Sequence, residues 1–300
     1  TTTSRHGMAE IENISGERVK EGIDEGKIVI VAGFQGVNKE TKEITTLGRG
    51  GSDATAVALA AALGADKCEI YTDVEGVFTA DPRIVDNARL LNEITYEEML
   101  EMASSGAKVL MARSVEFGRR YNVPIIVKPT FSNGLGTIVK EKVMEQAIVS
   151  GVTHNDKEIK FTLFGVPDQP GIAGKVFGPL SENGVVVDMI VQNVSKDSKT
   201  DISFTAPLEQ KSKVEKILND LSSELNAEGA DSDSNIARVS VIGAGMKAES
   251  GIASKMFSIL GENKINIAMI STSPIRISCV VNKDDMQKAI DSLHQEFIEF

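Results

Sequence analysis

Three glycines, an arginine, a serine and an aspartate stand together at Gly48–Asp53, directly before an alanine- and leucine-rich stretch at 54–63. Glycines let the backbone approach a ligand closely, and free amides at a helix start favour an anion. Arg49 adds a planar fork that binds a carboxylate or a phosphate at two points. Asp53 is equally suited to cap the helix, and a glycine-rich loop alone is a weak signal. No lysine follows the glycines, so this is not a Walker A phosphate loop.

A second polar stretch, Tyr71–Arg83, runs from the end of an expected strand into a loop rich in aspartate and glycine. In open α/β sheets, ligands bind beyond the carboxyl ends of strands. Thr72 and Asp73 offer a hydroxyl and a carboxylate to a nucleotide there, and Arg83 is a natural phosphate partner. A solvated turn explains each of these residues taken singly.

Strands and helices are expected to alternate around these two stretches. Short apolar or β-branched runs predict strands at 28–32, 68–71 and 124–127. Helices are predicted at 54–63, 96–108 and 109–121, with a turn or hairpin at 38–43. We expect the 28–32 strand to be buried, because its residues are all apolar. This order is typical of an α/β domain with a largely parallel central sheet.

The rest of the chain contains a repeat at an offset of eighty residues. Residues 171–190 and 251–270 are identical at ten of twenty positions without a gap. In each copy a strand, at 159–166 or 237–243, precedes a helix that begins at the repeated glycine. Two further strands and a second helix follow, which gives the βαββαβ-like order of small ligand-binding modules.

Composition limits the classes of function. A hydrophobic content of 41% with 25% charged residues is ordinary for a globular chain, and the net charge of −11 argues against a nucleic-acid partner. No stretch has the length of a transmembrane helix and no secretory signal is found, so we expect a cytoplasmic protein without a membrane partner. Cys68 and Cys279 lie in apolar runs and are predicted to be buried.

Taken together, the strings GRGGSDATAVALAAALGAD and YTDVEGVFTADPRIV, preceded by GFQGVNKETKEITTL, resemble the aspartate kinase branch of the amino-acid kinase family. The resemblance runs from about His6 to Gly136, and QNVSKDSKTDISFT, GAGMKAESGIA and ISTSPIRIS extend it over two ACT-like repeats. It implies the C-terminal part of an amino-acid-kinase-like open α/β sheet in residues 1–146. Two ferredoxin-like (α+β) ACT domains are expected to follow, at 147–230 and 231–300.

Aspartate kinases phosphorylate the β-carboxylate of L-aspartate with ATP and Mg²⁺, and the resemblance implies roles for residues in both strings. The implied substrate site consists of Arg49, Ser52, Asp53 and Phe34, with Arg49 on a substrate carboxylate. The implied ATP site consists of Thr72, Asp73, Phe78, Asp81, Arg83 and Lys108. No side chain is implied as a dedicated metal ligand.

One family motif is not found. The N-terminal Lys-Phe-Gly-Gly-Thr motif, whose lysine contacts the transferring phosphate, is absent from this sequence, so we expect the chain to be catalytically incomplete by itself. An alternative interpretation is a non-catalytic, amino-acid-sensing subunit that associates with a complete kinase. The intact GRGGSD and YTDVEGVFTADPR strings favour the enzyme, since a pure sensor needs neither. A glutamate or carbamate kinase is disfavoured by the tandem ACT repeats.

For the repeats, the resemblance implies feedback control by amino acids of lysine, threonine and methionine biosynthesis, commonly lysine, threonine or both. The implied first effector site consists of Asp168, Gly171, Ala173, Asp188 and Gln192. The implied second site consists of Ile252, Ala253, Asn266, Ile267 and Ser273. The second copy has Ala248 and Ala268 where the first has aspartates, so we expect the first copy to contribute the main site. ACT modules pair face to face, so we expect a homo-oligomer or heteromer.

Overall fold

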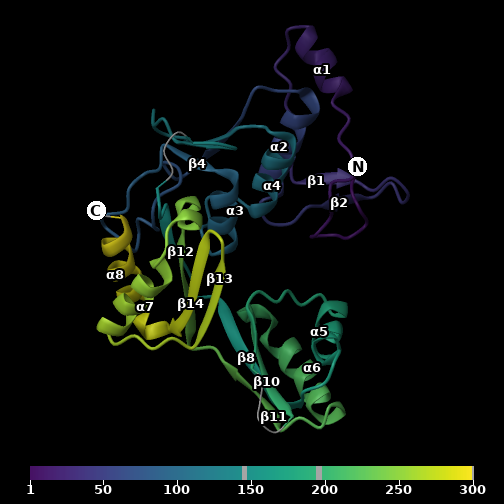
Figure 1. The fold of residues 1–300 in the computed structure, drawn as a ribbon. Coiled ribbons are helices and arrows are strands. Elements are labelled where there is room, and N and C mark those ends of the chain that lie inside the picture. Colours follow the sequence, from purple (N-terminus) through teal and green to yellow (C-terminus); the bar gives the residue numbers. More distant parts are fainter. Residues whose placement is uncertain (144–146, 194–197, 299–300) are drawn as a thin grey trace.

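The computed structural model describes residues 1–143, 147–193 and 198–298. In Figure 1 the N-terminal half of the chain, drawn in purple to blue, lies above two smaller α/β units. One unit is green to yellow and carries the C-terminus, and the other is teal to green. Residues 144–146, at the end of the expected kinase part, and 194–197 of the QNVSKDSKTDISFT string lie outside the described residues.

The N-terminal half folds around a four-stranded sheet with strand order β3-β5-β6-β4. Its strands are β3 (Cys68–Thr72), β4 (Glu93–Thr95), β5 (Ile125–Pro129) and β6 (Thr137–Lys140). Its helices are α2 (Gly51–Leu63), α3 (Tyr96–Ser104) and α4 (Ala112–Tyr121), the last two shorter than expected. Two of the three strand pairs are parallel, as predicted, while β5 and β6 run antiparallel. The three helices and the sheet share one hydrophobic core.

The helix ends follow from local sequence. Helix α2 begins after Gly50 and ends at Gly64, and both glycines adopt left-handed φ angles, of 68° and 64°. A Cβ at Gly50 would lie 1.8 Å from Cγ of Met111, so only glycine fits between α2 and the start of α4. Helix α3 begins with a capping box, in which Thr95 and Glu98 satisfy each other's backbone amides.

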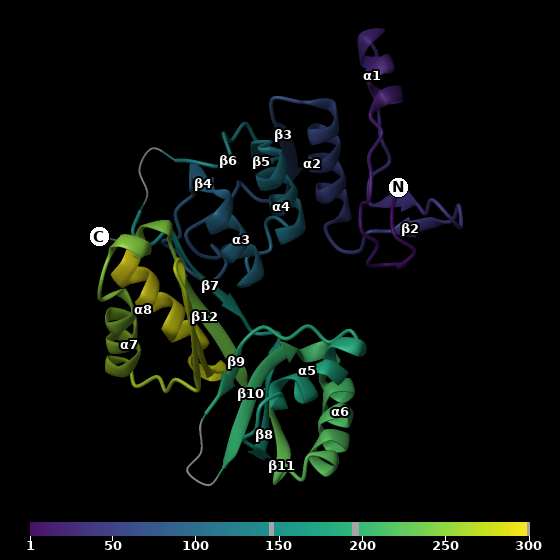
Figure 2. The same ribbon diagram turned by 45° about the vertical axis from the view of Figure 1, so that its right-hand side comes forward.

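The segment before α2 departs from expectation. Strands β1 (Gln35–Val37) and β2 (Ile44–Thr46) form an antiparallel hairpin around the predicted 38–43 turn. The buried strand predicted at 28–32 is wrong: the segment has no strand structure, and Ile28 and Ile30 are 96% and 92% exposed. A strand needs a neighbour to pair its backbone groups, and no described strand pairs with this segment. Helix α1 (Glu17–Asp24) has no buried residue and projects from the rest of the chain (Figure 2).

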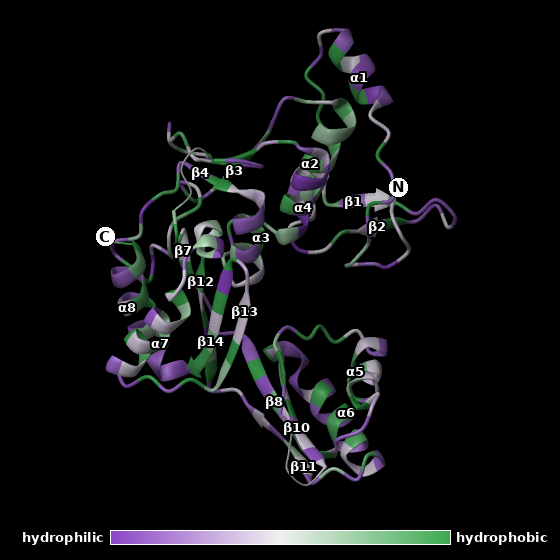
Figure 3. Ribbon diagram, viewed as in Figure 1, coloured by the Kyte–Doolittle hydropathy of each residue, from purple (hydrophilic) through white to green (hydrophobic). Residues whose placement is uncertain are grey.

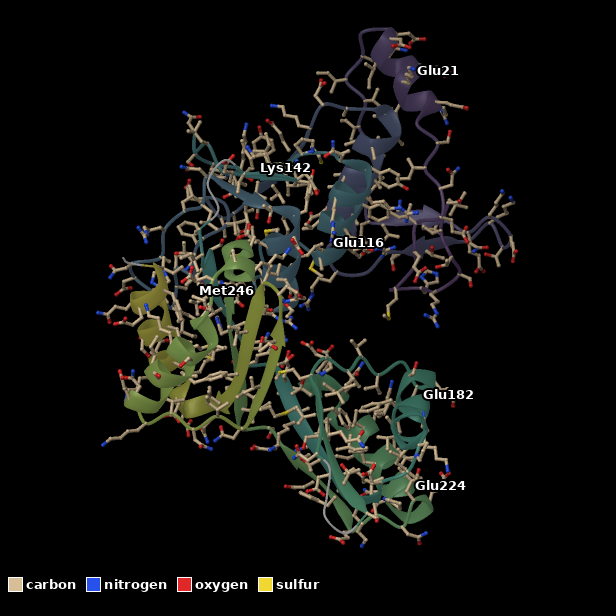
Figure 4. All side chains as sticks on the ribbon, in the orientation of Figure 1. Glu21, Glu116, Lys142, Glu182, Glu224 and Met246 are labelled. Atoms are coloured by element: carbon tan, nitrogen blue, oxygen red, sulfur yellow. The ribbon has the colours of Figure 1, made fainter. Side chains whose placement is uncertain are left out.

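The first module, residues 158–233, contains one copy of the repeat. Its elements are β8 (Glu158–Pro167), α5 (Ile172–Glu182), β9 (Ile190–Gln192), β10 (Lys199–Pro207), η1 (Leu208–Gln210), α6 (Lys211–Glu224) and β11 (Gly229–Asp233). The sheet order is β11-β8-β10-β9, and α5 and α6 pack against its strands in one hydrophobic core. Glu182 and Glu224, labelled in Figure 4, lie on the exposed sides of these helices.

The second module contains the other copy. Its elements are β12 (Ile236–Ile242), η2 (Ala244–Ala248), α7 (Ile252–Glu262), β13 (Met269–Ser273), β14 (Arg276–Asn282), η3 (Lys283–Asp285) and α8 (Met286–Ile298). Helices α5 and α7 begin after the repeated glycines Gly171 and Gly251, which have φ angles of 89° and 91°, as the repeat predicts. Met246, in η2, is buried where the second module meets the N-terminal half (Figure 4).

The fourth strand of the second module comes from an earlier part of the chain. Strand β7 (Gly151–Asn155) pairs antiparallel with β12, so the order is β13-β14-β12-β7. It occupies the place that β11 occupies beside β8 in the first module. The boundary expected at 147 therefore has to be corrected, because residues 151–155 belong to the sheet of the second repeat. The first module is inserted between β7 and β12.

Apolar residues gather on the inner strands of the second module. Figure 3 colours most of β12 as hydrophobic, and all seven residues from Ile236 to Ile242 are buried, including one arginine, Arg238. Within the ranges that the structure describes, no helix is both long and apolar enough to cross a membrane.

Candidate active site

A cavity of about 570 Å³ opens beyond the carboxyl end of β3, and we refer to it as the β3 cavity. Its walls come from three segments, 72–83, 106–109 and 152–154. The six residues predicted to meet a nucleotide all line it: Thr72, Asp73, Phe78, Asp81, Arg83 and Lys108. The structure therefore brings together residues from two separate parts of the sequence, at the edge of the sheet where α/β proteins bind ligands.

Charged groups of both signs lie on the wall of the β3 cavity. Arg83 donates two hydrogen bonds to Asp81, from Nε to Oδ1 at 3.0 Å and from Nη2 to Oδ2 at 2.8 Å. These bonds hold the pKa of the Asp81 carboxyl below its usual range. The Arg83 side chain nevertheless remains 77% exposed, so it is accessible to a ligand. Thr72 Oγ1 donates to Asp73 Oδ1 at 3.0 Å, which orients that carboxylate.

A second cavity, of about 620 Å³, contains the predicted substrate arginine, and we call it the Arg49 cavity. Arg49 shares its wall with Arg113 and Arg120 of α4. Glu116, labelled in Figure 4, and Glu10 contribute carboxylates to the same wall. Arg113 donates from Nη1 to the carbonyl oxygen of Ala9 at 2.9 Å, so it ties the N-terminal segment to α4. The three guanidinium groups outnumber the two carboxylates on this wall, which favours a small anion in the cavity.

The other predicted substrate residues lie at the start of α2. Phe34, Ser52 and Asp53 are not among the residues that line the Arg49 cavity. The Phe34 ring lies against Gly51, where an added Cβ would be 3.1 Å from its Cδ2 atom. Asp53 does not cap α2, because the cap residue is Gly50; it accepts instead from Ser52 Oγ at 3.4 Å. Burial raises the pKa of the Asp53 carboxyl, and the Ser52 hydrogen bond opposes that rise.

The predicted first effector residues lie at two elements of the first module, the start of α5 and the region of β9. Asp168, Gly171 and Ala173 surround the start of α5, where no atom lies within 4 Å of a Cβ added at Gly171. Gln192 ends β9. Asp188 precedes β9, and its carboxylate accepts a hydrogen bond from Arg238 of the second module. The carboxylate predicted to meet an effector ammonium therefore already pairs with a cation, although its side chain is 36% exposed.

The predicted second effector residues are also divided. Ile252 and Ala253 begin α7, while Asn266 and Ile267 lie on the connection between α7 and β13. Ser273 ends β13, and its hydroxyl donates to Oε1 of Glu101 in α3 at 3.4 Å. This serine therefore contacts the N-terminal half.

Sequence reasoning missed the contacts that join the three parts of the chain. Arg238, 1% exposed, donates to Glu158 Oε1 at 2.7 Å and to the carbonyl oxygen of Ser104 at 3.1 Å, besides its bond to Asp188. Burial raises the pKa of Glu158, and the Arg238 charge opposes that rise. A single arginine inside the apolar run 236–242 was the available signal, because a buried charge needs a partner.

Comparisons with known proteins agree with this arrangement. A sequence model of the Amino acid kinase family matches residues 1–129, and ACT domain models match residues 161–226 and 239–297. An aspartokinase of Mycolicibacterium smegmatis is 51% identical over 302 residues, which cover 99% of this chain and 72% of that protein. An aspartate kinase of Pseudomonas putida is 50% identical over 299 residues, with the same coverage of 99% and 72%. The chain belongs to the aspartate kinase family.

Solved structures of the family share its fold. E. coli aspartokinase III in complex with aspartate and ADP, in its R state, has a TM-score of 0.84 at 28% identity. That match covers 98% of this chain and 67% of the E. coli chain. The complex of the same protein with lysine and aspartate, in its T state, has a TM-score of 0.76, also at 28% identity, over 99% and 67% of the chains. The described conformation is therefore more similar to the R-state structure.

Proposed function

We propose that this chain binds ATP and L-aspartate as an aspartate kinase does, and that its residues serve the transfer of the γ-phosphoryl group to the β-carboxylate of aspartate. The observation that carries this proposal is the convergence of Thr72, Asp73 and Arg83 with Lys108 on the β3 cavity. Family membership at about half identity supports the same reaction, because the matched relatives are named aspartokinases.

In the β3 cavity, Arg83 and Lys108 would neutralise the phosphates, and Phe78 gives the wall an apolar face. Phosphoryl transfer between two anions depends on positioning and charge neutralisation more than on covalent chemistry by the protein. Mg²⁺ would enter with the nucleotide, held chiefly by phosphate oxygens and water, as is usual for this ion. A solved relative in complex with ADP and aspartate supports nucleotide binding by a chain of this fold.

In the aspartate site, Arg49 is assigned the two-point contact to a substrate carboxylate. Ser52 and Asp53, joined by a hydrogen bond at the N-terminal turn of α2, are assigned to order the substrate and the loop. Phe34 lies outside the Arg49 cavity and is assigned to the aspartate site at the start of α2, where its ring lies against Gly51 and its backbone amide donates to Thr55 Oγ1 at 3.2 Å.

The ACT modules are assigned a regulatory role, with lysine, threonine or both as effectors. A solved relative that carries lysine supports an amino-acid effector. We assign the main site to the first module, because Asp168 and Asp188 stand where the second repeat has alanines. Asp188 already pairs with Arg238, but its side chain is 36% exposed and so remains accessible to an effector. The exposed edge strands β9 and β13 suit pairing between modules of two chains.

Arg49→Lys tests the substrate assignment. An ammonium cannot reproduce the planar fork, so we expect the dissociation constant for aspartate to rise roughly tenfold or more while the dissociation constant for ATP changes little. The measurement is a calorimetric titration of the chain with each substrate in turn. Arg18→Lys, on the exposed α1 helix, is the matched control and should leave both constants unchanged. Equal changes in both constants for Arg49→Lys would assign Arg49 a structural role instead.

A further inference from the structure

Strand β7 is part of the second-module sheet and also part of the wall of the β3 cavity. Along its whole length it pairs with β12 of the second module, from Gly151 opposite Ile242 to Asn155 opposite Arg238. Three of its residues, Val152, Thr153 and His154, also line the β3 cavity. A regulatory sheet therefore contributes one wall of the cavity that we assign to the nucleotide.

Close backbone contacts hold β7 against the other walls. The amide of Val152 donates to the carbonyl oxygen of Thr79 at 2.7 Å, which joins β7 to the 72–83 segment. On the other side, a Cβ added at Gly106 would lie 1.9 Å from the carbonyl oxygen of His154. Gly106 also has a φ angle of 115°, so only glycine lets the 106–109 segment approach β7 this closely. The position of Lys108 in the cavity therefore depends on β7.

His154 lies within a cluster of charged groups. Arg83 and Lys108 line the same cavity, and Asp81 and Asp156 are the nearby carboxylates. Asp156 is itself paired with Lys283, at 3.2 Å. Burial holds the pKa of the His154 imidazole below its usual value, so the ring is predominantly neutral near pH 7 without a ligand.

We propose that His154 is a further phosphate-binding residue of this nucleotide site, and that it takes up a proton when a nucleoside di- or triphosphate binds beside Arg83 and Lys108. The inference rests on the proposed nucleotide role of the β3 cavity. A polyphosphate adds several negative charges within reach of the imidazole, and nearby anions favour the charged form of histidine. The proton then offsets the phosphate charge at a wall that the second module provides.

The sign of the pH dependence follows from this coupling. The ligand raises the pKa of His154, so the complex holds more protons than the free components and binding strengthens as the pH falls. ADP titrates in the same range, so the informative quantity is the difference between the wild-type chain and a variant that cannot be protonated. His154→Gln keeps an amide donor but carries no titratable group.

The experiment is a calorimetric titration with ADP in two buffers of different ionisation enthalpy. We expect the wild-type chain to take up more protons than His154→Gln, by up to about one proton per ADP. The affinity lost in the variant should be several-fold near about pH 6 and smaller near about pH 8. Adenosine, which has no phosphate, should bind both chains equally. Lys157→Gln removes an exposed cation two residues beyond β7 and should behave as the wild-type chain does.

Three outcomes would overturn the proposal. Equal proton uptake by the wild-type chain and His154→Gln, with ADP binding lost in Arg83→Ala, would make His154 structural while the nucleotide site stands. If His154→Gln lost equal affinity for adenosine and for ADP, the substitution would have changed the shape of the cavity wall rather than removed a phosphate contact. No ADP binding by the wild-type chain would remove the proposed function together with this inference. If the His154→Gln variant is unstable, the comparison is repeated with His154→Asn. The His154→Asn result counts only if this variant unfolds at the same midpoint as the wild-type chain.

Discussion

At the scale of single residues, the β3 cavity contains a cation that is paired before any ligand arrives. Arg83 forms two hydrogen bonds with Asp81, yet its side chain is mostly exposed. A guanidinium has five donors, so Arg83 can keep Asp81 and still bind a phosphate with its remaining N–H groups. Asp81 therefore holds Arg83 in a fixed orientation at the cavity.

Removing that cation should weaken nucleotide binding directly. We expect Arg83→Ala to raise the dissociation constant of ATP and ADP roughly ten- to hundredfold, the usual range for losing a charged hydrogen bond. Calorimetry with each nucleotide measures the change. Arg89→Ala, in the connection that follows the cavity loop, is a control because Arg89 is not among the lining residues. An unchanged constant in Arg83→Ala would remove this residue from the nucleotide site.

The grouping of Thr72, Asp73, Phe78, Asp81 and Arg83 at one cavity was predictable from sequence because these residues are nearly contiguous. Thr72 to Arg83 form one loop after one strand, and the strand-end rule for α/β sheets locates such a loop without knowledge of the rest of the fold. His154 was not predictable in this way. It reaches the cavity only because β7 lies between the loop and β12, and that placement depends on a pairing between distant parts of the sequence.

At the scale of elements, α3 joins the N-terminal half to the second module. Its Glu98 is 2% exposed and accepts hydrogen bonds through both carboxylate oxygens. Oε2 accepts from the Thr95 hydroxyl at 2.6 Å within the capping box, and Oε1 accepts from the amide of Ala244 at 2.9 Å. The Ser150 hydroxyl, directly before β7, also donates to Oε1. The residue that caps the helix therefore also fixes the module beside it.

Because Glu98 both caps α3 and contacts the second module, two substitutions that remove the same cap should differ in their effect on stability. Thr95→Ala should cost about 1 kcal/mol of unfolding free energy, the usual value for a lost helix cap. Glu98→Ala should cost about 3 kcal/mol or more, because it also leaves the Ser150 and Ala244 donors buried without partners. Denaturant unfolding of both variants measures the difference.

Glu97→Ala is the matched control for that comparison. Glu97 lies on the same turn and pairs with Lys247 at 2.9 Å at the surface, so its loss should cost under about 1 kcal/mol. If Glu98→Ala were no less stable than Thr95→Ala, the contacts of Glu98 with the second module would contribute nothing to stability.

The wrong prediction at 28–32 and the correct one at 68–71 show what an apolar run can establish. Both runs suit a strand, but only β3 has a partner, because β5 pairs with it in parallel from Cys68 to Thr72. An apolar run shows that a segment can be buried. Burial itself requires neighbouring elements, and a short window of sequence does not contain them.

At the scale of the whole molecule, Arg238 contacts all three parts of the chain. It lies on β12, and its partners are Glu158 of the first module, Asp188 beside β9 and the carbonyl oxygen at the end of α3. Removing one member of a buried ion pair leaves its partner charged and buried, at a cost of about 3–5 kcal/mol. We therefore expect Arg238→Met to lower the unfolding free energy by that amount and to split thermal unfolding into separate transitions.

The loss of unfolding free energy in Arg238→Met, relative to the wild-type chain, should depend on pH. Burial already raises the pKa of Glu158, and without the Arg238 charge that pKa rises further. The folded variant then binds a proton that the unfolded chain releases, so its deficit relative to the wild-type chain shrinks as the pH falls. Scanning calorimetry at several pH values measures this. Arg276→Met should lose less unfolding free energy than Arg238→Met, because the partner of Arg276, Glu101, is 24% exposed. A single transition and a pH-independent deficit would contradict this role for Arg238.

The insertion of the first module between β7 and β12 also imposes an order on biosynthesis. The ribosome makes β7 first, and β12 emerges roughly eighty residues later, a delay of about 4–16 s at common elongation rates. Strands β8 to β11 are all synthesised within that interval, so the nascent first module can close its own sheet while β7 still has a free edge. The second module can close only when the C-terminal strands arrive. Because β7 also forms a wall of the β3 cavity, the cavity assumes its described form only after β12 has been synthesised and paired with β7.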